Sequence, residues 1–238
     1  MRNVEEEEND CRGRGERRIL LKTLKIPEAT IMRLAVYSRY LERAEKQGIT
    51  TVSSAAIADG TGVSPAQVRK DLAYFGEFGT RGVGYHTGEL SSNIRRILGL
   101  NRCWSAVIVG AGKLGSALAL YEGFLSRGFR IVGVFDIDPK IVGKHLGEIE
   151  VLHVSQLEDV VARKKAEIGI ITVPASAAQE VGERLVKAGV RALLNFSPHV
   201  LNLARDVIVR NVDFSLHLEV LTFNLVFGKI KKEVAEEK

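Results

Sequence analysis

Apolar side chains in the first hundred residues recur with the period of an α-helix. One such segment begins at Pro27 and stops before Gly48. Its apolar positions are Ile31, Leu34, Ala35, Tyr37, Leu41 and Ala44. A second helix is expected from Ser53 or Ser54 up to the glycine-containing turn at 60–63, and a third follows that turn.

The third helix carries a strong start signal. Ser64 is a candidate N-cap, Pro65 suits the first helical position, and Gln67 stands at the spacing of a capping box. The glycine- and aromatic-rich segment 76–85 then predicts a short hairpin, and a further helix is expected over 87–98. Helices, a glycine-containing turn and a hairpin wing together predict an N-terminal winged helix-turn-helix domain.

Beyond Trp104, short β-type runs alternate with helical segments. The expected strands cover 105–109, 130–135, 148–152, 168–173, 192–195 and 207–212. One helix is expected to start at Lys113 and a short one to lie near Pro139. Two further helices are expected over 156–163 and 176–188. This alternation predicts an α/β domain with a doubly wound parallel sheet.

Four regions are expected along the chain. Residues 1–25 lack any amphipathic period and should form a disordered tail. The winged-helix domain covers 26–100 and the sheet domain covers 101–214. The remainder, 215–238, holds a final helix whose high apolar content suggests that it packs on another subunit or another domain.

Composition adds weaker constraints. The net charge of +5 favours a polyanionic partner, although only weakly as a whole-chain property. The two cysteines, Cys11 and Cys103, form no metal-binding or dithiol motif, so we expect free thiols and no metal site. Because no apolar run suits a membrane span or a secretion signal, we expect a cytoplasmic protein without a membrane partner.

A glycine motif follows the first strand of the second domain. The segment Gly110–Gly115 reads G-x-G-x-x-G and opens a helix, which is typical of a Rossmann domain. In such a motif the glycines permit a tight turn, close approach of the pyrophosphate, and packing of helix on strand. Asp136 ends the next strand, where an acid bonds the ribose hydroxyls and repels a 2′-phosphate. We therefore expect NAD(H), as NADH and NAD⁺, to bind Asp136 and the loop residues Gly110, Ala111, Gly112, Lys113, Leu114 and Gly115.

Two further loops follow strands whose carboxyl ends should meet near this motif. In open α/β sheets, ligands bind at that edge. The two loops are therefore expected to flank the nicotinamide half of the cofactor. They consist of Thr172, Val173 and Pro174, and of Asn195, Phe196, Ser197 and Pro198.

The third helix is the expected DNA-reading helix. In a helix-turn-helix, the N-terminal residues of the second helix of the motif approach base edges in the major groove. The residues so placed are Ser64, Ala66, Gln67, Arg69 and Lys70. Glutamine can pair with adenine and arginine with guanine, whereas Lys70 and Arg39 are expected on phosphates. Arg81 on the wing is expected to enter a minor groove.

These motifs together carry a family resemblance. They resemble the redox-sensing transcriptional repressors of the Rex family, in the same order and from about Lys25 to the last helix. The matching segments are Ile26–Thr30, Ser64–Gly76, Gly79–Tyr85, Gly110–Gly115, Thr172–Ala175 with Ala178 and Gln179, and Leu194–Pro198.

The resemblance implies a homodimer that binds a palindromic operator near fermentation and respiration genes. It implies that NADH releases the DNA, and that NAD⁺ competes more weakly or favours the DNA-bound form. It implies a C-terminal helix swapped between subunits. It also implies an ion pair between Arg33 and Asp213 in one state, with Tyr121 and Phe214 lining the nicotinamide region.

Two other readings of the residues remain open at this point. The first is an NAD-dependent dehydrogenase with a helical extension, in which His199 would be the general acid or base. The second is a structural or CoA-binding Rossmann module, since this fold hosts many functions. A DNA-binding protein that is switched by its cofactor is the favoured hypothesis. The sequence supplies a cofactor motif and a DNA-reading helix but no second substrate domain.

Overall fold

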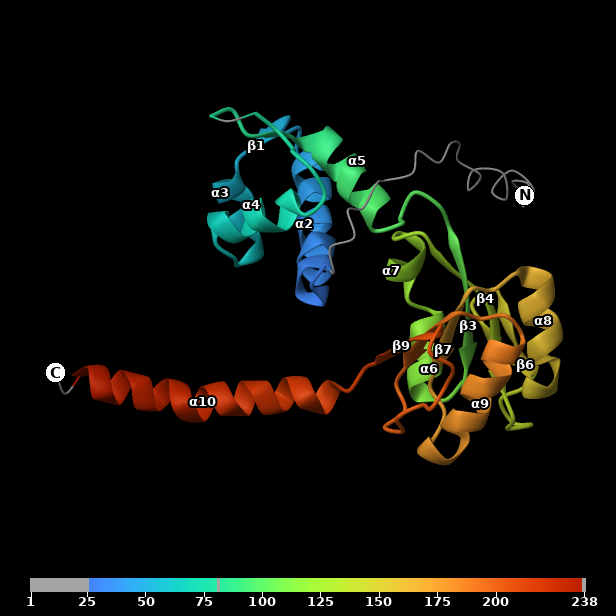
Figure 1. Cartoon of the computed structure of the whole chain (residues 1–238). Helices are drawn as coiled ribbons and strands as arrows, with labels where there is room; N and C mark the ends of the chain where they lie inside the picture. Colours follow the sequence, from blue (N-terminus) through green and yellow to red (C-terminus); the bar gives the residue numbers. More distant parts are fainter. Residues whose placement is uncertain (1–25, 81, 237–238) are drawn as a thin grey trace. The chain divides into compact units, whose positions relative to one another are not determined.

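The chain forms two compact units, Met1–Cys103 and Trp104–Lys238, in a computed structural model (Figure 1). The structure describes residues 26–80 and 82–236, with side chains described up to residue 227. The expected disordered tail and the wing residue Arg81 lie outside the described residues.

The first unit is a small helical domain with a two-stranded sheet. Its helices are α2 (Glu28–Lys46), α3 (Ser54–Thr61), α4 (Pro65–Ala73) and α5 (Thr87–Ile97), and its strands are β1 (Thr51–Val52) and β2 (Tyr85–His86). Buried apolar side chains from all four helices meet in one cluster. Among them are Leu34, Leu41, Ile57, Val68, Leu90 and Ile94.

The helix starts follow the sequence signals with one difference. Ser53 caps α3 and Ser64 caps α4, each accepting a hydrogen bond from the backbone N–H three residues later. The predicted capping box, however, forms only in part. The Gln67 side chain donates to Asp71 in the next turn of the helix rather than reaching back to the cap.

The wing is built from two pieces. Thr80 and Gly84 exchange backbone hydrogen bonds of 2.9 and 3.0 Å and so close the tight turn. Strand β2 then pairs antiparallel with β1, which precedes α3 in the chain. The wing therefore returns to the start of the helix-turn-helix, and its register ties the turn to the same small core.

The second unit contains a seven-stranded sheet in the order β5-β6-β4-β3-β7-β8-β9. Every neighbouring pair is parallel except β5 and β6. The strands are β3 (Trp104–Val109), β4 (Phe129–Asp136), β5 (His145–Leu146), β6 (Ile149–His153), β7 (Ile168–Ile171), β8 (Ala192–Asn195) and β9 (Ile208–Asn211). The order reverses at β3, which confirms the expected doubly wound Rossmann-type sheet.

Helices cover both faces of this sheet, as alternation along β3 shows. Val107 and Val109 point into a core with α8 (Leu157–Lys164) and α9 (Ala175–Lys187), whereas Ile108 points to the other face, beneath the α6–α7 segment. On that other face lie α6 (Lys113–Ala119) and α7 (Glu122–Leu125). A short 3₁₀ turn, η1 (Val154–Gln156), leads into α8.

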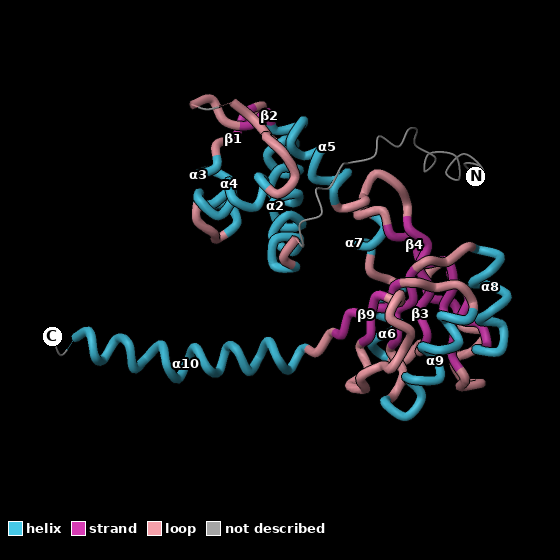
Figure 2. The backbone as a smooth tube through the Cα atoms, in the orientation of Figure 1, coloured by secondary structure: helices cyan, strands magenta, loops and turns pink. Residues whose placement is uncertain are grey.

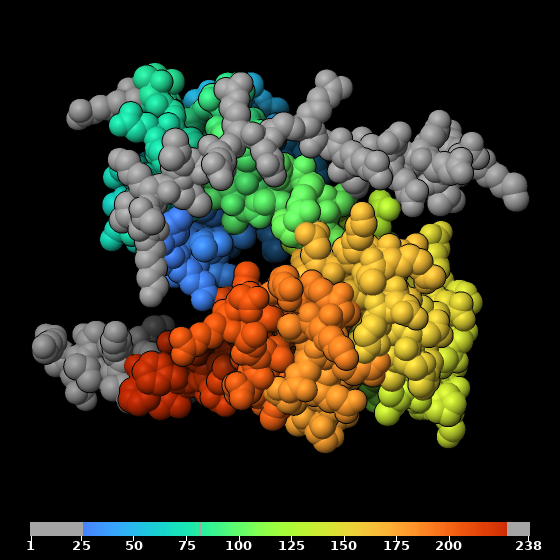
Figure 3. Space-filling view, turned by 45° about the vertical axis from the view of Figure 1, so that its right-hand side comes forward, coloured from blue at the N-terminus to red at the C-terminus, as the bar shows by residue number. Residues whose placement is uncertain are grey.

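Helices α8 and α9 lie side by side, and an ion pair joins them. Figure 2 shows the two helices beside the strands of this unit, and their surfaces adjoin in the space-filling view of Figure 3. Arg184 of α9 donates to both carboxylate oxygens of Glu158 in α8, at 2.7 and 2.9 Å. This bidentate pair is a direct polar contact between the two helices.

One expectation for this unit is wrong. No helix forms near Pro139, because the turn that begins at Asp138 ends at Gly143, where φ is +84° and the backbone N–H donates to Val151 in β6. The helix expected from Lys113 does form; it ends at Ala119, and the separate helix α7 follows. At the end of the first unit, Cys103 is disulfide-bonded, so the expectation of a free thiol is wrong at this position.

The final helix, α10 (Phe214–Glu236), is the least covered element of the described chain. Nine large apolar side chains along it remain half or more exposed, from 50% at Phe227 to 66% at Leu225. They are Phe214, Leu216, Leu218, Val220, Leu221, Phe223, Leu225, Val226 and Phe227. None of the described helices is both long and apolar enough to cross a membrane.

Candidate functional sites

The glycine loop after β3 packs against the start of the loop after β7. Gly110 has φ of +100°, and a Cβ there would lie 2.8 Å from the Thr172 backbone. A Cβ on Gly115 would contact the Gly110 carbonyl oxygen and lie 2.8 Å from the Thr172 hydroxyl. The first and third glycines are therefore required by packing within the protein itself.

Gly112 differs from these two glycines. A Cβ built on it would meet no atom within 4 Å, and its φ of −66° is open to any residue. Packing within the described chain thus gives no reason for a glycine here, whereas close approach of a ligand does. Gly112 is also the N-cap of α6 and makes no side-chain cap, so the cap residue gives the first-turn N–H groups no side-chain acceptor. The cradle fits a dinucleotide pyrophosphate.

Asp136 closes the same loop. Its Oδ2 accepts a 2.6 Å hydrogen bond from the Ala111 N–H, and its Oδ1 accepts from the N–H groups of Ile137 and Asp138. The carboxylate therefore holds the glycine loop at the end of β4. An ionised carboxylate has about four acceptor positions, so one remains for a ligand hydroxyl.

The loop after β7 supports the cradle from beneath. The Thr172 hydroxyl lies 2.7 Å from the Gly110 carbonyl oxygen and 3.0 Å from that of Val109, so it bonds loop backbone. Val173 packs against the core beneath α9, and Pro174 is the N-cap of that helix. Of these three residues, Thr172 is the one that the structure brings to the glycine loop.

The loop after β8 divides into buried and exposed members. Asn195 is fully buried, and its amide nitrogen bonds the backbone oxygens of Ser197 and His199 and the Asn211 side chain. Asn195 therefore shapes the loop from inside. Phe196 stacks on Phe214 with ring centroids 5.9 Å apart, which joins two residues that were predicted separately.

Tyr121 lies at the break between α6 and α7. Its side chain is 60% exposed and packs edge-on against Phe124, with centroids 5.2 Å apart. Pro198 and His199 are also exposed. In the described residues, no group of three His, Cys, Asp or Glu side chains is placed to hold a metal ion.

The predicted DNA-reading residues lie on one exposed helix. Ser64, Ala66, Arg69 and Lys70 of α4 are exposed, whereas Gln67 is half-buried. Arg69 donates a 2.9 Å hydrogen bond to the Ser54 hydroxyl, which ties α4 to the start of α3. The structure therefore presents a polar and basic face at the N-terminal half of this helix.

Asp71 is the residue of this site that the sequence reasoning missed. Its side chain is fully buried beneath α4 and accepts hydrogen bonds from four side chains of α2 and α4. The donors are Thr30, Arg33, Tyr37 and Gln67. The signal was its position between Val68 and Leu72, on the apolar face of the helix, where an unpaired acid would be costly.

The pKa values in this cluster shift as the contacts require. Burial alone would raise the pKa of the Asp71 carboxyl, but the hydrogen bonds from Arg33, Gln67, Tyr37 and Thr30 outweigh it and hold that pKa below its ordinary value. Burial, followed by the bond to Asp71, raises the pKa of the Tyr37 hydroxyl. Asp71 is therefore ionised and Tyr37 neutral at ordinary pH.

Arg33 and Asp213, the predicted switch pair, each have a local partner. Arg33 makes a bidentate ion pair with Asp71, with nitrogen–oxygen distances of 2.6 and 2.7 Å. Asp213 accepts from the backbone N–H and the hydroxyl of Ser215, which lower the pKa of its carboxyl and cap the start of α10. Their mutual contact stays a prediction.

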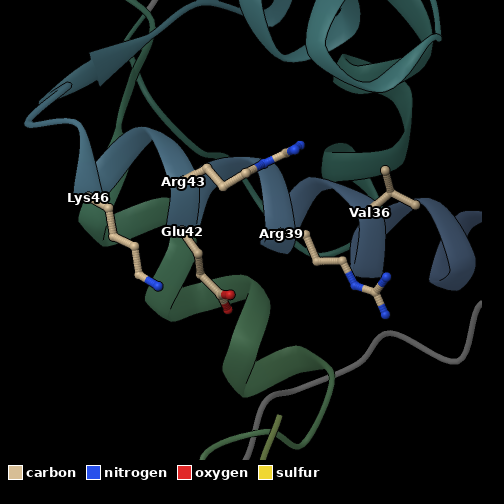
Figure 4. A pocket seen from close by; sticks show the side chains of 5 residues that line it. All are labelled: Val36, Arg39, Glu42, Arg43 and Lys46. Carbon is tan, nitrogen blue, oxygen red and sulfur yellow. The ribbon is translucent and has the colours of Figure 1, made fainter. Parts of the chain in front are cut away.

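A basic cavity of about 460 Å³ lies along α2 (Figure 4). Its lining side chains are Val36, Arg39, Glu42, Arg43 and Lys46. Glu42 pairs with Arg95 of α5 at 2.9 Å, so three cations dominate the lining. Arg39 was expected on DNA phosphates; Arg43 and Lys46 were missed, although their spacing places them on the same helix face.

Comparison with known proteins gives consistent matches for both units. A family model described as "Putative DNA-binding protein N-terminus" matches residues 25–73, and one described as "CoA binding domain" matches residues 101–199. The redox-sensing transcriptional repressor Rex of Carboxydothermus hydrogenoformans is 63% identical over 205 residues, which cover 86% of this chain and 99% of that protein. Rex of Streptomyces coelicolor is 48% identical over 84% of this chain and 77% of its own length.

Two solved structures match over most of the chain. A crystal structure of RSP with beta-NAD⁺ and operator DNA has a TM-score of 0.81 at 40% identity, covering 91% of this chain and all of that one. A structure of RSP with beta-NADH has a TM-score of 0.80 at 38% identity, covering 89% of this chain and all of that one. RSP is described as a Rex-family repressor. The resemblance that the motifs indicated is thereby confirmed, and this chain belongs to the Rex family of redox-sensing transcriptional repressors.

Proposed function

We propose that this chain represses transcription by binding operator DNA through its first unit and releases that DNA when NADH binds its second unit. The observation that carries the proposal is Gly112, whose missing side chain leaves a space that no described protein atom fills. Both functional halves are present in one chain whose Rex relatives are repressors, a non-enzymatic role. The dehydrogenase reading therefore gives way to a sensor.

The residues of the second unit take distinct parts in holding the nucleotide. The glycine loop and the start of α6 receive the pyrophosphate, and Asp136 receives a ribose hydroxyl and disfavours a 2′-phosphate. Thr172 and Asn195 shape the neighbouring loops, because their polar atoms are engaged within the protein. The nicotinamide side is assigned to Tyr121, Val173, Pro174, Phe196, Ser197, Pro198 and Phe214. NADH differs from NAD⁺ by a neutral, reduced nicotinamide, so discrimination must arise in this group.

In the first unit, α4 is the major-groove helix. Gln67 and Arg69 are assigned to base edges, with Ser64 and Ala66 beside them. Lys70, together with Arg39 and its two cationic neighbours on α2, is assigned to phosphates, which fix position without reading sequence. Arg81 is assigned to the minor groove beside the wing. We assign residues 26–100 to DNA binding, residues 101–214 to nucleotide binding and residues 215–238 to dimerisation.

Dimerisation is assigned to α10. An isolated helix with nine large apolar side chains at least half exposed is costly in water, and a second copy of the chain would cover them. Exchange of this helix between two subunits is the arrangement that we propose. Truncation after Asp213 is expected to give a monomer by sedimentation, and a stable dimer of the truncated chain would contradict the assignment.

The switch needs a ligand that binds its two states unequally. We propose that NADH favours a dimer in which the two α4 helices no longer match successive turns of DNA, about 34–36 Å apart. Arg33 and Asp213 are assigned to pair with each other in one of the two states, in addition to the local partners that each has in this structure. Coupling is reciprocal, so operator DNA weakens NADH binding by the same factor.

The decisive test titrates an operator-bound sample in parallel with NADH, NAD⁺ and coenzyme A. NADH is expected to release DNA at the lowest concentration, NAD⁺ weakly if at all, and coenzyme A not at all. Equal retention with and without saturating NADH would refute the proposal, and release by coenzyme A would identify a different ligand.

Arg69→Ala and Lys70→Ala are expected to weaken operator binding. Only Lys70→Ala should weaken binding to all DNA sequences equally. Turnover assays with NAD⁺ and simple alcohols serve as the enzymatic control. We also propose that the protein binds its DNA in the cytoplasm.

A further inference from the structure

Gln67 stands in the first turn of α4, the helix that the proposed function places in the major groove, and its role as a base reader rests on that proposed function. The Gln67 side-chain amide donates a 2.9 Å hydrogen bond to Oδ1 of Asp71, one turn further along the helix. A base-reading side chain is thus already held by the protein in the absence of DNA.

The acceptor in this bond is fixed from several directions. Besides Gln67, Oδ1 accepts from the Thr30 hydroxyl at 3.1 Å and from Arg33 at 2.7 Å. Oδ2 accepts from Arg33 at 2.6 Å and from the Tyr37 hydroxyl at 2.9 Å. Thr30 and Tyr37 are themselves buried, so the Asp71 carboxylate is anchored to α2 and has no freedom to rotate.

A fixed carboxylate selects one orientation of the Gln67 amide. Turning the amide over would place its carbonyl oxygen against Asp71 Oδ1, and two acceptors repel each other. The oxygen and the second N–H are therefore left for another partner. In the major groove, a single amide reads adenine with one acceptor and one donor. The free oxygen and the second N–H of Gln67 are such a pair.

We propose that Asp71 is a specificity-determining positioning residue, which presets the Gln67 amide to read adenine while making no contact with DNA itself. Presetting matters because a side chain that is already ordered loses less conformational entropy on binding. Arg33 and Tyr37 then act one step further back, as the groups that hold Asp71 in place. The ion pair between α2 and α4 is thereby part of sequence recognition.

The test is Asp71→Asn, which keeps the shape of the side chain but removes its charge, so it weakens the pair with Arg33 as well as the bond to Gln67. The amide nitrogen introduced by this substitution, when it faces Gln67, would donate to the Gln67 oxygen and turn the Gln67 amide over. Binding is measured on operator duplexes that carry each of the four base pairs at each half-site position. The unaltered protein is expected to prefer A·T about tenfold at one position, and Asp71→Asn to reduce that preference below about threefold. Affinity for a scrambled duplex, and its salt dependence, should stay unchanged, because phosphate contacts set both.

Gln67→Ala supplies the matched variant. It is expected to lose the same preference at the same position, and to have no further effect when combined with Asp71→Asn. A uniform loss of affinity over all four base pairs in Asp71→Asn would overturn the inference, since a purely structural role predicts that result. Retention of the full A·T preference would overturn it equally.

A second measurement does not depend on the folding of a variant. In the DNA-free protein, the side-chain NH₂ group of Gln67 is expected to show NMR order close to that of the backbone. The exposed Gln47, at the end of α2, is the matched control and should be mobile. Equal mobility of the two amides would refute the inference. If the unaltered protein shows no operator preference while Gln67 is ordered, the proposed function fails and the preset amide stands.

Discussion

The two sites of this chain are built in opposite ways. The proposed nucleotide cradle depends on side chains that are missing, because Gly110 and Gly115 let backbone and Thr172 approach closely. The proposed DNA-reading helix, α4, depends on side chains that are present, because a buried Asp71 gathers donors from α2 and α4. The cradle should therefore fail when atoms are added, and the helix when atoms are removed.

The largest effect on folding is expected from Gly115→Ala. The added methyl group would contact the Gly110 carbonyl oxygen, so the loop must shift, and overpacking of this kind costs about 1–3 kcal/mol. NADH affinity should fall as well, since the loop that receives the pyrophosphate moves. Denaturant unfolding and NADH fluorescence measure the two effects.

Gly182→Ala is the control for that substitution. Gly182 lies within α9, and a Cβ there would meet Leu201 and Leu203 at 3.5 Å, an ordinary contact distance. It should leave the free energy of unfolding unchanged or raise it slightly, because alanine favours helix. If both variants unfold alike, the close approach at Gly115 is not what stabilises the loop.

The next effect is expected from Tyr37→Phe, which removes one donor to Asp71 and nothing else. Loss of a hydrogen bond to a charged, buried acceptor should lower the free energy of unfolding by about 1–2 kcal/mol. The pKa of the Tyr37 hydroxyl is raised, so this donor is present throughout the usual pH range. Thermal unfolding of the first unit provides the measurement.

Tyr40→Phe provides the comparison. Tyr40 packs half-buried against the same cluster, and its hydroxyl has no hydrogen-bond partner among the described residues. Its loss should change stability by less than about 0.5 kcal/mol. A similar cost for both tyrosines would show that ring packing, not the bond to Asp71, stabilises this region.

The same contrast explains what the sequence could and could not predict. A cradle made of missing side chains leaves a short local signature, so Gly110–Gly115 and Asp136 were identified without a structure. A cluster made of side-chain hydrogen bonds joins residues about forty positions apart, such as Arg33 and Asp71, and has no local pattern. Asp71 stands between Val68 and Leu72 on the apolar face of α4, but that position carries no information on its hydrogen-bond partners.

The error near Pro139 has the same origin in long-range pairing. The segment after Pro139 has helical potential, yet Gly143 bonds β6 and ends the turn. The nicotinamide contact expected of Asn195 stays a prediction, and the structure turns its amide inward to Asn211 and the backbone. The position of each loop could be predicted from the sequence, but the direction of each side chain depends on neighbours from other strands.

A smaller effect is expected from pH. Hydrogen bonds hold the pKa of Asp71 below its unfolded value of about 3.9, so the stability it provides is fully present above that pH. That stability is lost as the pH falls through the lower, folded-state pKa. Unfolding measured from about pH 5 down to about pH 3 should therefore show a shallower acid decline in Asp71→Asn than in the unaltered protein. An identical slope in both would mean that Asp71 titrates alike in the folded and unfolded states.

Glu158 gives the corresponding comparison in the second unit. Its hydrogen bond with Arg184 also lowers the pKa of its carboxyl, but both side chains are partly exposed. Solvent screens such a pair, which is worth less than about 1 kcal/mol. Glu158→Gln should therefore flatten the acid decline less than Asp71→Asn does.

The smallest effect on folding, and the sharpest on function, is expected from Gly112→Glu. The new side chain would start in open space with an ordinary φ, so the free energy of unfolding should change by less than about 0.5 kcal/mol. Its carboxylate would occupy the place assigned to the pyrophosphate and repel it, so NADH should no longer release operator DNA. DNA binding without nucleotide should be unaffected, because the first unit is untouched. Gly112→Ala should give a partial loss, since it adds bulk without charge. Full release of DNA by NADH from Gly112→Glu would mean that the nucleotide binds elsewhere. The contrast between a site built on absent side chains and a site built on side-chain hydrogen bonds would then no longer describe this chain.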